Sequence, residues 1–169
     1  MSLLPIHSRK QLARLLIGGA FAVMSFVTQA QTPEIQLTQS GTSLQAQTLS
    51  ELTDKVVYLD FWASWCVPCR RSFPWMNAMQ AKYAEQGFVI IAINLDQERA
   101  LADAFIAETQ ANFHIEFDPA GEYAESFGVA GMPTSLLIDK NGHIRAQHQG
   151  FFNAKTAHYE EQIQALLAE

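Results

Sequence analysis

The chain has 169 residues, with 11 basic side chains, 17 acidic side chains, a formal charge of −6 and two cysteines. This length suits one domain of ordinary size that buries its own core. The acidic balance and the lack of any basic stripe argue against nucleic-acid binding. Two cysteines allow a single intrachain disulfide, which excludes both a disulfide framework and a four-cysteine zinc site.

Residues 1–30 have the pattern of a secretory signal peptide. Three basic side chains within residues 9–14 precede an apolar stretch at residues 15–27, and small residues frame a cleavage site after Ala30. The apolar stretch has 13 residues, whereas a membrane-spanning helix needs about 20, so we favour cleavage over the alternative of an uncleaved membrane tether. Cleavage leaves one domain at residues 31–169 with 8 basic and 17 acidic side chains, a charge of −9. The expected destination lies outside the cytosol, where disulfides persist.

Hydrophobic patterning in the rest of the chain predicts alternating strands and helices. A turn-rich lead-in at residues 35–52 has the pattern of a short hairpin or a loose segment. Continuous apolar runs predict strands at residues 56–62, 88–95 and 113–117. Apolar positions spaced three and four apart predict helices at residues 66–83, 98–109, 123–127 and 156–167.

A β-hairpin is predicted near the C-terminus. The Asn141-Gly142 pair, a strong hairpin turn signal, lies between apolar runs at residues 135–139 and 143–146. Strand–helix–strand–helix units followed by a hairpin and a last helix indicate an α/β fold, with a mixed sheet covered on both faces.

Both cysteines lie between a predicted buried strand and a predicted helix, in the sequence Cys66-Val-Pro-Cys69. Open α/β sheets react at the carboxyl ends of their strands. The helix N-terminus stabilises a thiolate at Cys66, which makes Cys66 the nucleophile. Cys69 follows one helical turn later, at the spacing needed to resolve a mixed disulfide. The pattern therefore predicts thiol–disulfide exchange.

Other uses of the cysteine pair fit less well. A structural disulfide across two intervening residues closes a tiny loop and gains only about 2 kcal/mol. A zinc site needs two further ligands, and the five histidines have no ligand-like spacing. Covalent haem attachment needs a histidine directly after the second cysteine, where this chain has Arg70. We expect neither a metal nor another cofactor.

Asp60 is a charged residue inside an apolar strand. Burying a carboxylate is costly unless it is paired or neutral, so we expect desolvation to raise its pKa. The alternative is an edge position at which the side chain faces solvent.

Residues 60–70 (DFWASWCVPCR) resemble the active-site segment of the thioredoxin superfamily. Residues 131–134 (GMPT) resemble its cis-proline loop, and residues 136–142 resemble its terminal hairpin. The signal, the lead-in, Phe73-Pro74 and an additional segment at about residues 98–127 are more similar to the periplasmic TlpA/ResA-type branch. The resemblance covers residues 35–169. It implies a thioredoxin fold, a central mixed β-sheet flanked by helices, with a TlpA-type N-terminal lead-in and a central insertion.

The resemblance also implies roles for the cysteines and their surroundings. Cys66 is the attacking thiol, Cys69 is the resolving thiol, and the two form the redox-active disulfide. Asp60 matches the buried acid of thioredoxin, which accepts the proton of the resolving cysteine. Many TlpA/ResA-type sequences instead have an Asn there and a Glu just before the Phe/Met-Pro pair, where this chain has Ser72. This departure puts a role in cytochrome c maturation in doubt.

Client binding is assigned by the resemblance to the loop around the proline. Pro133 is expected to be cis and to face the cysteines, and the backbone of Met132 to pair with an extended client segment as an added strand. Thr134 belongs to the same loop. Trp65 is expected to border the reactive sulfur as a flat contact surface, with a core aromatic as the alternative.

The sequence therefore predicts a periplasmic thiol–disulfide oxidoreductase that reduces disulfide-bearing protein substrates. A membrane electron donor is expected to re-reduce it, as in the family it resembles. Two alternatives use the same residues: an oxidant or isomerase of secreted proteins, and an assembly factor that holds copper through Cys66 and Cys69. The client protein and the oligomeric state are not specified by the sequence.

Overall fold

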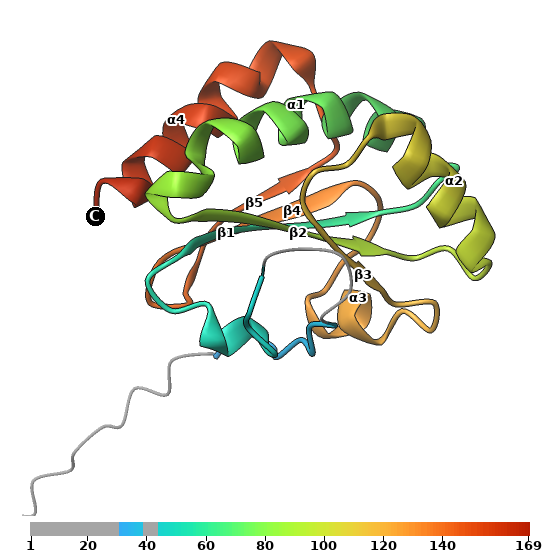
Figure 1. Ribbon diagram of the computed structural model, residues 1–169, viewed down its shortest axis with the longest axis horizontal. Coiled ribbons are helices and arrows are strands. Elements are labelled where there is room, and N and C mark those ends of the chain that lie inside the picture. The colour runs from blue at the N-terminus through green and yellow to red at the C-terminus, as the bar shows by residue number, and fades with distance from the viewer. Residues whose placement is uncertain (1–30, 39–43) are drawn as a thin grey trace, which may run out of the picture. The chain divides into compact units, whose positions relative to one another are not determined.

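The computed structural model describes residues 31–38 and 44–169 (Figure 1). The signal peptide or tether predicted at residues 1–30 lies outside these described residues. Within the described ranges, no helix has both the length and the apolar character needed to cross a membrane.

Five strands form one mixed sheet, in the spatial order β3-β2-β1-β4-β5. Their bounds are Val56–Trp62 for β1, Phe88–Asn94 for β2, His114–Phe117 for β3, Thr134–Ile138 for β4 and Ile144–Gln149 for β5. The first three strands run parallel, β4 runs antiparallel to β1, and β5 runs antiparallel to β4. Strand β1 is central and every residue in it is buried, which its apolar sequence predicts.

Helices and short turns cover both faces of the sheet (Figure 1). Helices α1 (Val67–Tyr83), α2 (Arg99–Thr109) and α4 (Thr156–Leu167) pack on one face. The lead-in, with its 3-10 turn η1 (Leu49–Glu51), and the short helix α3 (Glu122–Ser126) pack on the other. Two more 3-10 turns, η2 (Ala84–Gln86) and η3 (Asn153–Lys155), adjoin α1 and α4. This architecture confirms the predicted thioredoxin fold.

Side chains alternate between the two faces along β1, because successive residues of a strand point in opposite directions. Tyr58 and Trp62 belong to the core beneath α1, α2 and α4, whereas Leu59 and Phe61 belong to the core beneath the lead-in and α3. Asp60 lies two residues from both Tyr58 and Trp62, so its side chain points to the same face of the sheet. It therefore faces the helix that carries the cysteines.

The lead-in forms the short hairpin that was one of the two predicted arrangements. Gln36 and Thr48 form an antiparallel bridge, and the Leu49 N–H donates to the Ile35 carbonyl at 3.0 Å. The side chain of Ile35 is fully buried against the sheet. The lead-in thus covers the core on the α3 side of the sheet and is not a loose segment.

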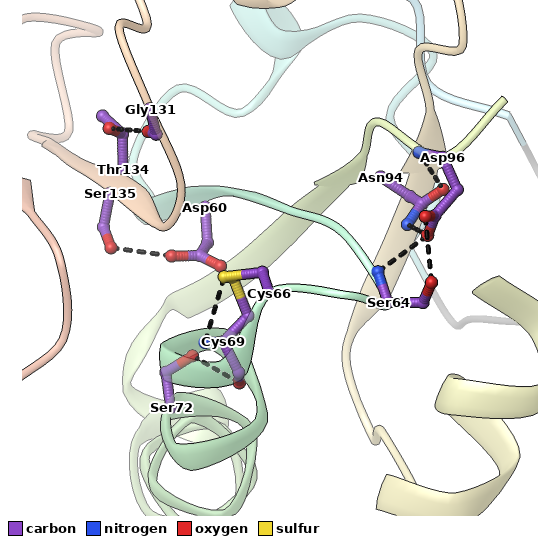
Figure 2. The surroundings of a disulfide bond; sticks show 10 residues. All are labelled: Asp60, Ser64, Cys66, Cys69, Ser72, Asn94, Asp96, Gly131, Thr134 and Ser135. Atoms are coloured by element: carbon purple, nitrogen blue, oxygen red, sulfur yellow. Dashed lines mark hydrogen bonds between the residues drawn. A yellow bond between two sulfur atoms is a disulfide. The ribbon is translucent and has the colours of Figure 1, made fainter. Parts of the chain in front are cut away.

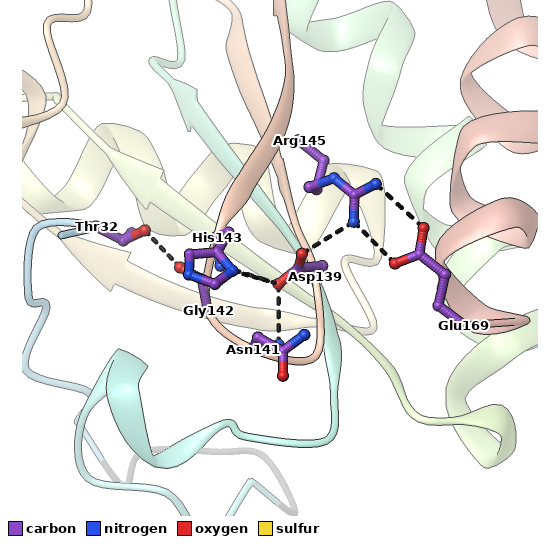
Figure 3. A network of polar contacts seen from close by, with 7 residues as sticks. All are labelled: Thr32, Asp139, Asn141, Gly142, His143, Arg145 and Glu169. Carbon is purple, nitrogen blue, oxygen red and sulfur yellow. Dashed lines mark hydrogen bonds and ion pairs between the residues drawn. The ribbon is translucent and has the colours of Figure 1, made fainter. Parts of the chain in front are cut away.

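The β4–β5 hairpin is fixed by an aspartate at its turn (Figure 3). The Asp139 carboxylate accepts hydrogen bonds from two backbone N–H groups of the turn, at 2.9 and 3.0 Å. Arg145 joins Asp139 to Glu169 at the C-terminus, with N–O distances of 3.0 and 2.8 Å. Gly142 has a φ of 81°, a left-handed conformation that glycine adopts without strain. Strand β5 runs to Gln149, three residues beyond the predicted end, because it pairs with the whole of β4.

Candidate active site

The two cysteines form a disulfide at the N-terminus of α1. Cys66 is the N-cap of this helix, and its sulfur accepts a hydrogen bond from the Cys69 N–H at 3.2 Å. Pro68 lies in the first turn, where a missing N–H costs nothing. The predicted position of the pair, between the end of β1 and a helix start, is confirmed.

The two sulfur-bearing residues differ in their contact with solvent. Cys66 is 5% exposed and Cys69 is fully buried. Trp65 and Val67, on either side of Cys66, are 68% and 67% exposed. A core position for Trp65, the alternative considered from the sequence, is therefore wrong. Cys66 is therefore the more accessible of the two cysteines.

Asp60 lies beneath the disulfide, in the middle of β1. Its side chain is fully buried, so an edge position facing solvent is wrong. The Ser135 hydroxyl donates a hydrogen bond to its Oδ1 at 2.7 Å, and its Oδ2 has no hydrogen-bond partner among the described residues. Burial raises the pKa of Asp60 to about 7, and the Ser135 hydrogen bond opposes that rise only in part. Figure 2 shows the carboxylate extending toward the disulfide, with Oδ2 on the disulfide side.

A second aspartate holds the loop that precedes Cys66 (Figure 2). Asp96 follows β2 and is 5% exposed. Its carboxylate accepts hydrogen bonds from the Ser64 N–H at 2.8 Å and the Ser64 hydroxyl at 2.9 Å. The Asn94 side-chain amide donates to the same carboxylate at 2.7 Å. Sequence analysis missed this contact, although the polar Asn94 and Asp96 at the end of an apolar strand were a usable signal.

The Met132–Pro133 peptide bond is cis, as the resemblance implies. The Thr134 hydroxyl donates to the Gly131 carbonyl at 2.6 Å, and Thr134 is fully buried. Its side chain therefore secures the loop from inside the protein and is not exposed on the surface. The Gly150 N–H donates to the Pro133 carbonyl at 2.8 Å, which ties the loop to the end of β5.

A pocket of about 250 Å³ lies beside this loop. It is lined by Ala130, Gly131, Met132, Pro133, Gln149 and Gly150. The contribution of Gln149 and Gly150 was not predicted, because these residues lie at the end of β5, far from the proline in sequence. Only the pairing of β4 with β5 brings them there.

The remaining polar clusters do not resemble a metal centre. Within residues 31–38 and 44–169, no group of three or more His, Cys, Asp or Glu side chains is arranged to hold a metal ion. His114 is buried on β3 and contacts the Glu116 carboxylate. The Thr38 hydroxyl donates to the same carboxylate at 3.1 Å, which attaches the lead-in to β3.

Comparison with known proteins finds a family and named relatives. The model of the Redoxin family matches residues 27–163. The thiol-disulfide oxidoreductase ResA of Oceanobacillus iheyensis is 38% identical over 120 residues, which cover 70% of this chain and 62% of the relative. The protein of the same name from Bacillus thuringiensis is 36% identical over 102 residues, covering 60% of this chain and 59% of that one. The chain thus spans about three fifths of the length of these curated relatives.

Solved structures show the same fold. A crystal structure from Chlorobium tepidum, described as a candidate thiol:disulfide interchange protein DsbE, has a TM-score of 0.75 and 48% identity, covering 81% of this chain and 95% of that one. A solution structure from Bacteroides thetaiotaomicron, described as a candidate protein disulfide isomerase, has a TM-score of 0.72 and 28% identity. The match covers 82% of this chain and 89% of that one.

Proposed function

The chain belongs to the Redoxin family, and on that premise we propose that it is a thiol–disulfide oxidoreductase that reduces disulfides of protein clients. The observation that carries this proposal is the cysteine pair at the start of α1, with Cys66 5% exposed between two exposed residues and Cys69 fully buried. A buried carboxyl whose pKa is raised to about 7 lies beneath the pair. Two similar proteins are named thiol-disulfide oxidoreductases, and this supports the proposed activity.

The first step is attack by Cys66 on a client disulfide. The N-terminus of α1 stabilises the Cys66 thiolate, since backbone N–H groups such as that of Cys69 point at its sulfur. The thiolate forms a bond to one client sulfur, the client S–S bond breaks, and the other client sulfur leaves as a thiolate that takes a proton from solvent. The product is a mixed disulfide between Cys66 and the client.

The second step is resolution by Cys69. Its thiol proton passes to the Asp60 carboxylate, directly or through water, and the new thiolate attacks the Cys66 sulfur. The bond between Cys66 and the client breaks, the Cys66–Cys69 disulfide forms, and the second client sulfur leaves as a thiolate that takes a proton from solvent, while Asp60 returns the Cys69 proton to solvent. The client has gained two electrons and two protons overall, and the enzyme has lost them. Ser72 takes no part as an acid, because its hydroxyl donates to the Cys69 carbonyl at 2.9 Å.

Client binding is proposed at the surface around Cys66. Trp65 supplies an exposed flat contact, and the Met132–Pro133 loop leads directly into β4. An extended client segment that pairs with the Met132 backbone would form a short added strand against this loop, ahead of β4, because β4 itself is already paired with β1 and β5. Pro133 then faces the mixed disulfide, and Thr134 acts through the loop that its hydroxyl secures.

The proposed compartment is the periplasm, with residues 1–30 acting as a cleaved signal or as an inner-membrane tether. In that oxidising environment the Cys66–Cys69 disulfide must be re-reduced, and we propose a membrane thiol donor for this role. The uncharged Val67 and Pro68 between the cysteines favour a reductant, since no imidazolium there stabilises the Cys66 thiolate further. An oxidant using the same residues is the competing direction.

A trapping experiment tests the reaction. In the Cys69→Ser variant the second step is blocked, so mixed disulfides with clients accumulate in cells and are identified by mass spectrometry. The Cys66→Ser variant is the matched control, because it retains a thiol but loses the attacking sulfur. If Cys69→Ser captures no more protein than Cys66→Ser while Cys66 still reacts with a model disulfide, exchange with protein clients is refuted.

The direction is tested by the reduction potential in a glutathione or dithiothreitol titration. We expect a potential near that of thioredoxin, about −270 mV. A potential near −120 mV, typical of a strong oxidant, would contradict the reductant assignment and favour the oxidant.

A further inference from the structure

A row of polar residues crosses three strands of the sheet at the height of the active site. Asp60 on β1 pairs with Ser135 on β4, and Ser135 pairs with His148 on β5. Directly opposed residues in antiparallel strands project from the same face, so the three side chains share the face covered by α1 and α4. Every residue of β4 is buried, and Ser135 lies within this otherwise mostly apolar strand. A hydroxyl at this position therefore requires an explanation.

The Ser135 hydroxyl is committed to Asp60. A serine hydroxyl has one proton to donate, and this one is directed to Asp60 Oδ1 at 2.7 Å. Its lone pairs remain for other groups, and the buried Tyr58 phenol interacts with Ser135. With Oδ1 held in this way, the carboxyl group has a fixed orientation. The oxygen without a partner, Oδ2, is the one on the disulfide side in Figure 2.

We propose that Ser135 is a positioning residue for proton transfer: its hydroxyl aims Asp60 Oδ2 at the cysteine pair and sets the pH range in which Asp60 accepts a proton from Cys69. This inference rests on the proposed function and adds to it a residue that acts through Asp60. Ser135 itself touches neither cysteine in this role.

The physical reason is the selective stabilisation of one protonation state. A hydrogen bond donated to a carboxylate favours its charged form, whereas burial favours its neutral form. Ser135 is the hydrogen-bond donor to Asp60 in the described part of the chain, so its hydroxyl opposes the effect of burial alone. Without this donor Asp60 would be protonated over a wider pH range, and fewer molecules would hold the carboxylate that Cys69 needs.

The other groups facing Asp60 leave a pH window for the test. Tyr58 on β1 has its pKa raised by burial and by Asp60, so it stays neutral through neutral pH. His148 on β5 is half-buried and stacks on Tyr159 of α4, with 4.6 Å between ring centroids. Burial lowers the pKa of His148 below its ordinary 6.5, so its imidazole is neutral at pH 7 and above. The remaining group is the cysteine pair of α1, which does not titrate while oxidised.

The direct measurement is the titration of the Asp60 carboxyl carbon by NMR in the oxidised protein, where no thiol is coupled to it. In Ser135→Ala we expect the Asp60 pKa to rise by about one unit, the usual strength of a hydrogen bond to a charged group. From a starting pKa of about 7, the ionised fraction at pH 7 then falls about fivefold.

The kinetic measurement is the release of the mixed disulfide. In Ser135→Ala the release rate at pH 7 should fall about fivefold, and it should recover by pH 9, where Asp60 is ionised in both proteins. Ser135→Thr and Ser135→Val form a matched pair of similar shape that differs in the hydroxyl. Threonine should restore the wild-type titration, and valine should behave like alanine. Ser72→Ala removes a buried hydroxyl that does not contact Asp60, and it should leave the Asp60 titration unchanged.

Two results would overturn the proposal. The first is an Asp60 titration that is the same in wild type, Ser135→Ala and Ser135→Val. The second is a shifted Asp60 titration with an unshifted pH profile for release of the mixed disulfide, which would show that the Ser135 hydrogen bond does not control proton transfer from Cys69. The carboxyl titration needs no client. If the protein failed to reduce any client disulfide, the proposed function would fall while the titration still decided whether Ser135 controls Asp60.

Discussion

Two buried aspartates flank the cysteine loop, and their carboxylates differ in the number of hydrogen bonds that they accept. Asp96 accepts three hydrogen bonds, two from Ser64 and one from Asn94, which together engage both of its carboxylate oxygens. Asp60 accepts one from Ser135, and its Oδ2 has no partner in the described part of the chain. The fully bonded aspartate holds the loop, whereas the poorly bonded one is suited to gain and lose a proton.

The difference arises from where the two aspartates lie on the sheet. Asp96 follows β2, beyond the last paired residue, where backbone N–H groups of neighbouring loops are free to donate. Asp60 lies within β1, whose backbone groups are engaged by β2 and β4 on either side. Only side chains can donate hydrogen bonds to the Asp60 carboxylate there, and among the residues that the structure describes Ser135 is the one that does so.

The largest expected effect is on the pH dependence of stability in Asp60→Asn. The folded-state pKa of Asp60, about 7, lies above its ordinary 3.8, so the folded state binds the proton more tightly than the unfolded state. Stability from this group is therefore complete below pH 4 and is lost as the pH rises through 7, by about 4 kcal/mol in total. Asparagine does not titrate and removes this loss.

Urea unfolding of the two oxidised proteins between pH 4 and pH 8 measures this effect. The free energy of unfolding of Asp60→Asn, taken relative to wild type, should rise with pH by about 4 kcal/mol. A difference that stays constant over this range would show that Asp60 has an ordinary pKa, and the contrast between the two aspartates would collapse.

The next effect is on catalysis by the same variant. Without a carboxylate beneath Cys69, release of the mixed disulfide at pH 7 should slow about a hundredfold, the usual contribution of a general base. Rapid-mixing kinetics with a disulfide-bearing peptide measure this step. The first attack by Cys66, followed in a Cys69→Ser background, should change little. Equal slowing of both steps would mean that Asp60 shapes the site without accepting the proton.

A smaller effect is expected at the other aspartate. Asp96→Ala leaves the Ser64 N–H and the Asn94 amide without their acceptor, so the free energy of unfolding should fall by about 2 kcal/mol. Urea unfolding measures this loss. The pH midpoint for release of the mixed disulfide should stay at the wild-type value, since Asp60 keeps Ser135. A shifted midpoint would show that the two aspartates are coupled.

Much of this fold was predictable because its strands and helices are strongly patterned. The bounds of β1 and α4 agree with the predicted ranges, because buried apolar runs and helical spacing determine them locally. The end of β5 was misplaced, because its exposed residues have little apolar character and its length depends on pairing with β4. Cys66, Cys69 and Asp60 were proposed as site residues from their chemistry within an apolar context, and the structure shows a Cys66–Cys69 disulfide and a fully buried Asp60. Ser135 and Asp96 were missed, because a serine or an aspartate carries no local sign of its partner.

The sequence alone predicted the candidate reacting groups of this protein: two cysteines three residues apart at a helix start, and one acid in an apolar strand. Those features are local, since they depend on spacing, helix capping and hydrophobic pattern. Only the tertiary structure decided how the acid is held. Asp60 and Ser135 are 75 residues apart in the chain, and the antiparallel register of β1 and β4 places them opposite one another. Strand register arises from the packing of the whole sheet, and it therefore places Ser135 as the donor that leaves Oδ2 directed at the cysteines.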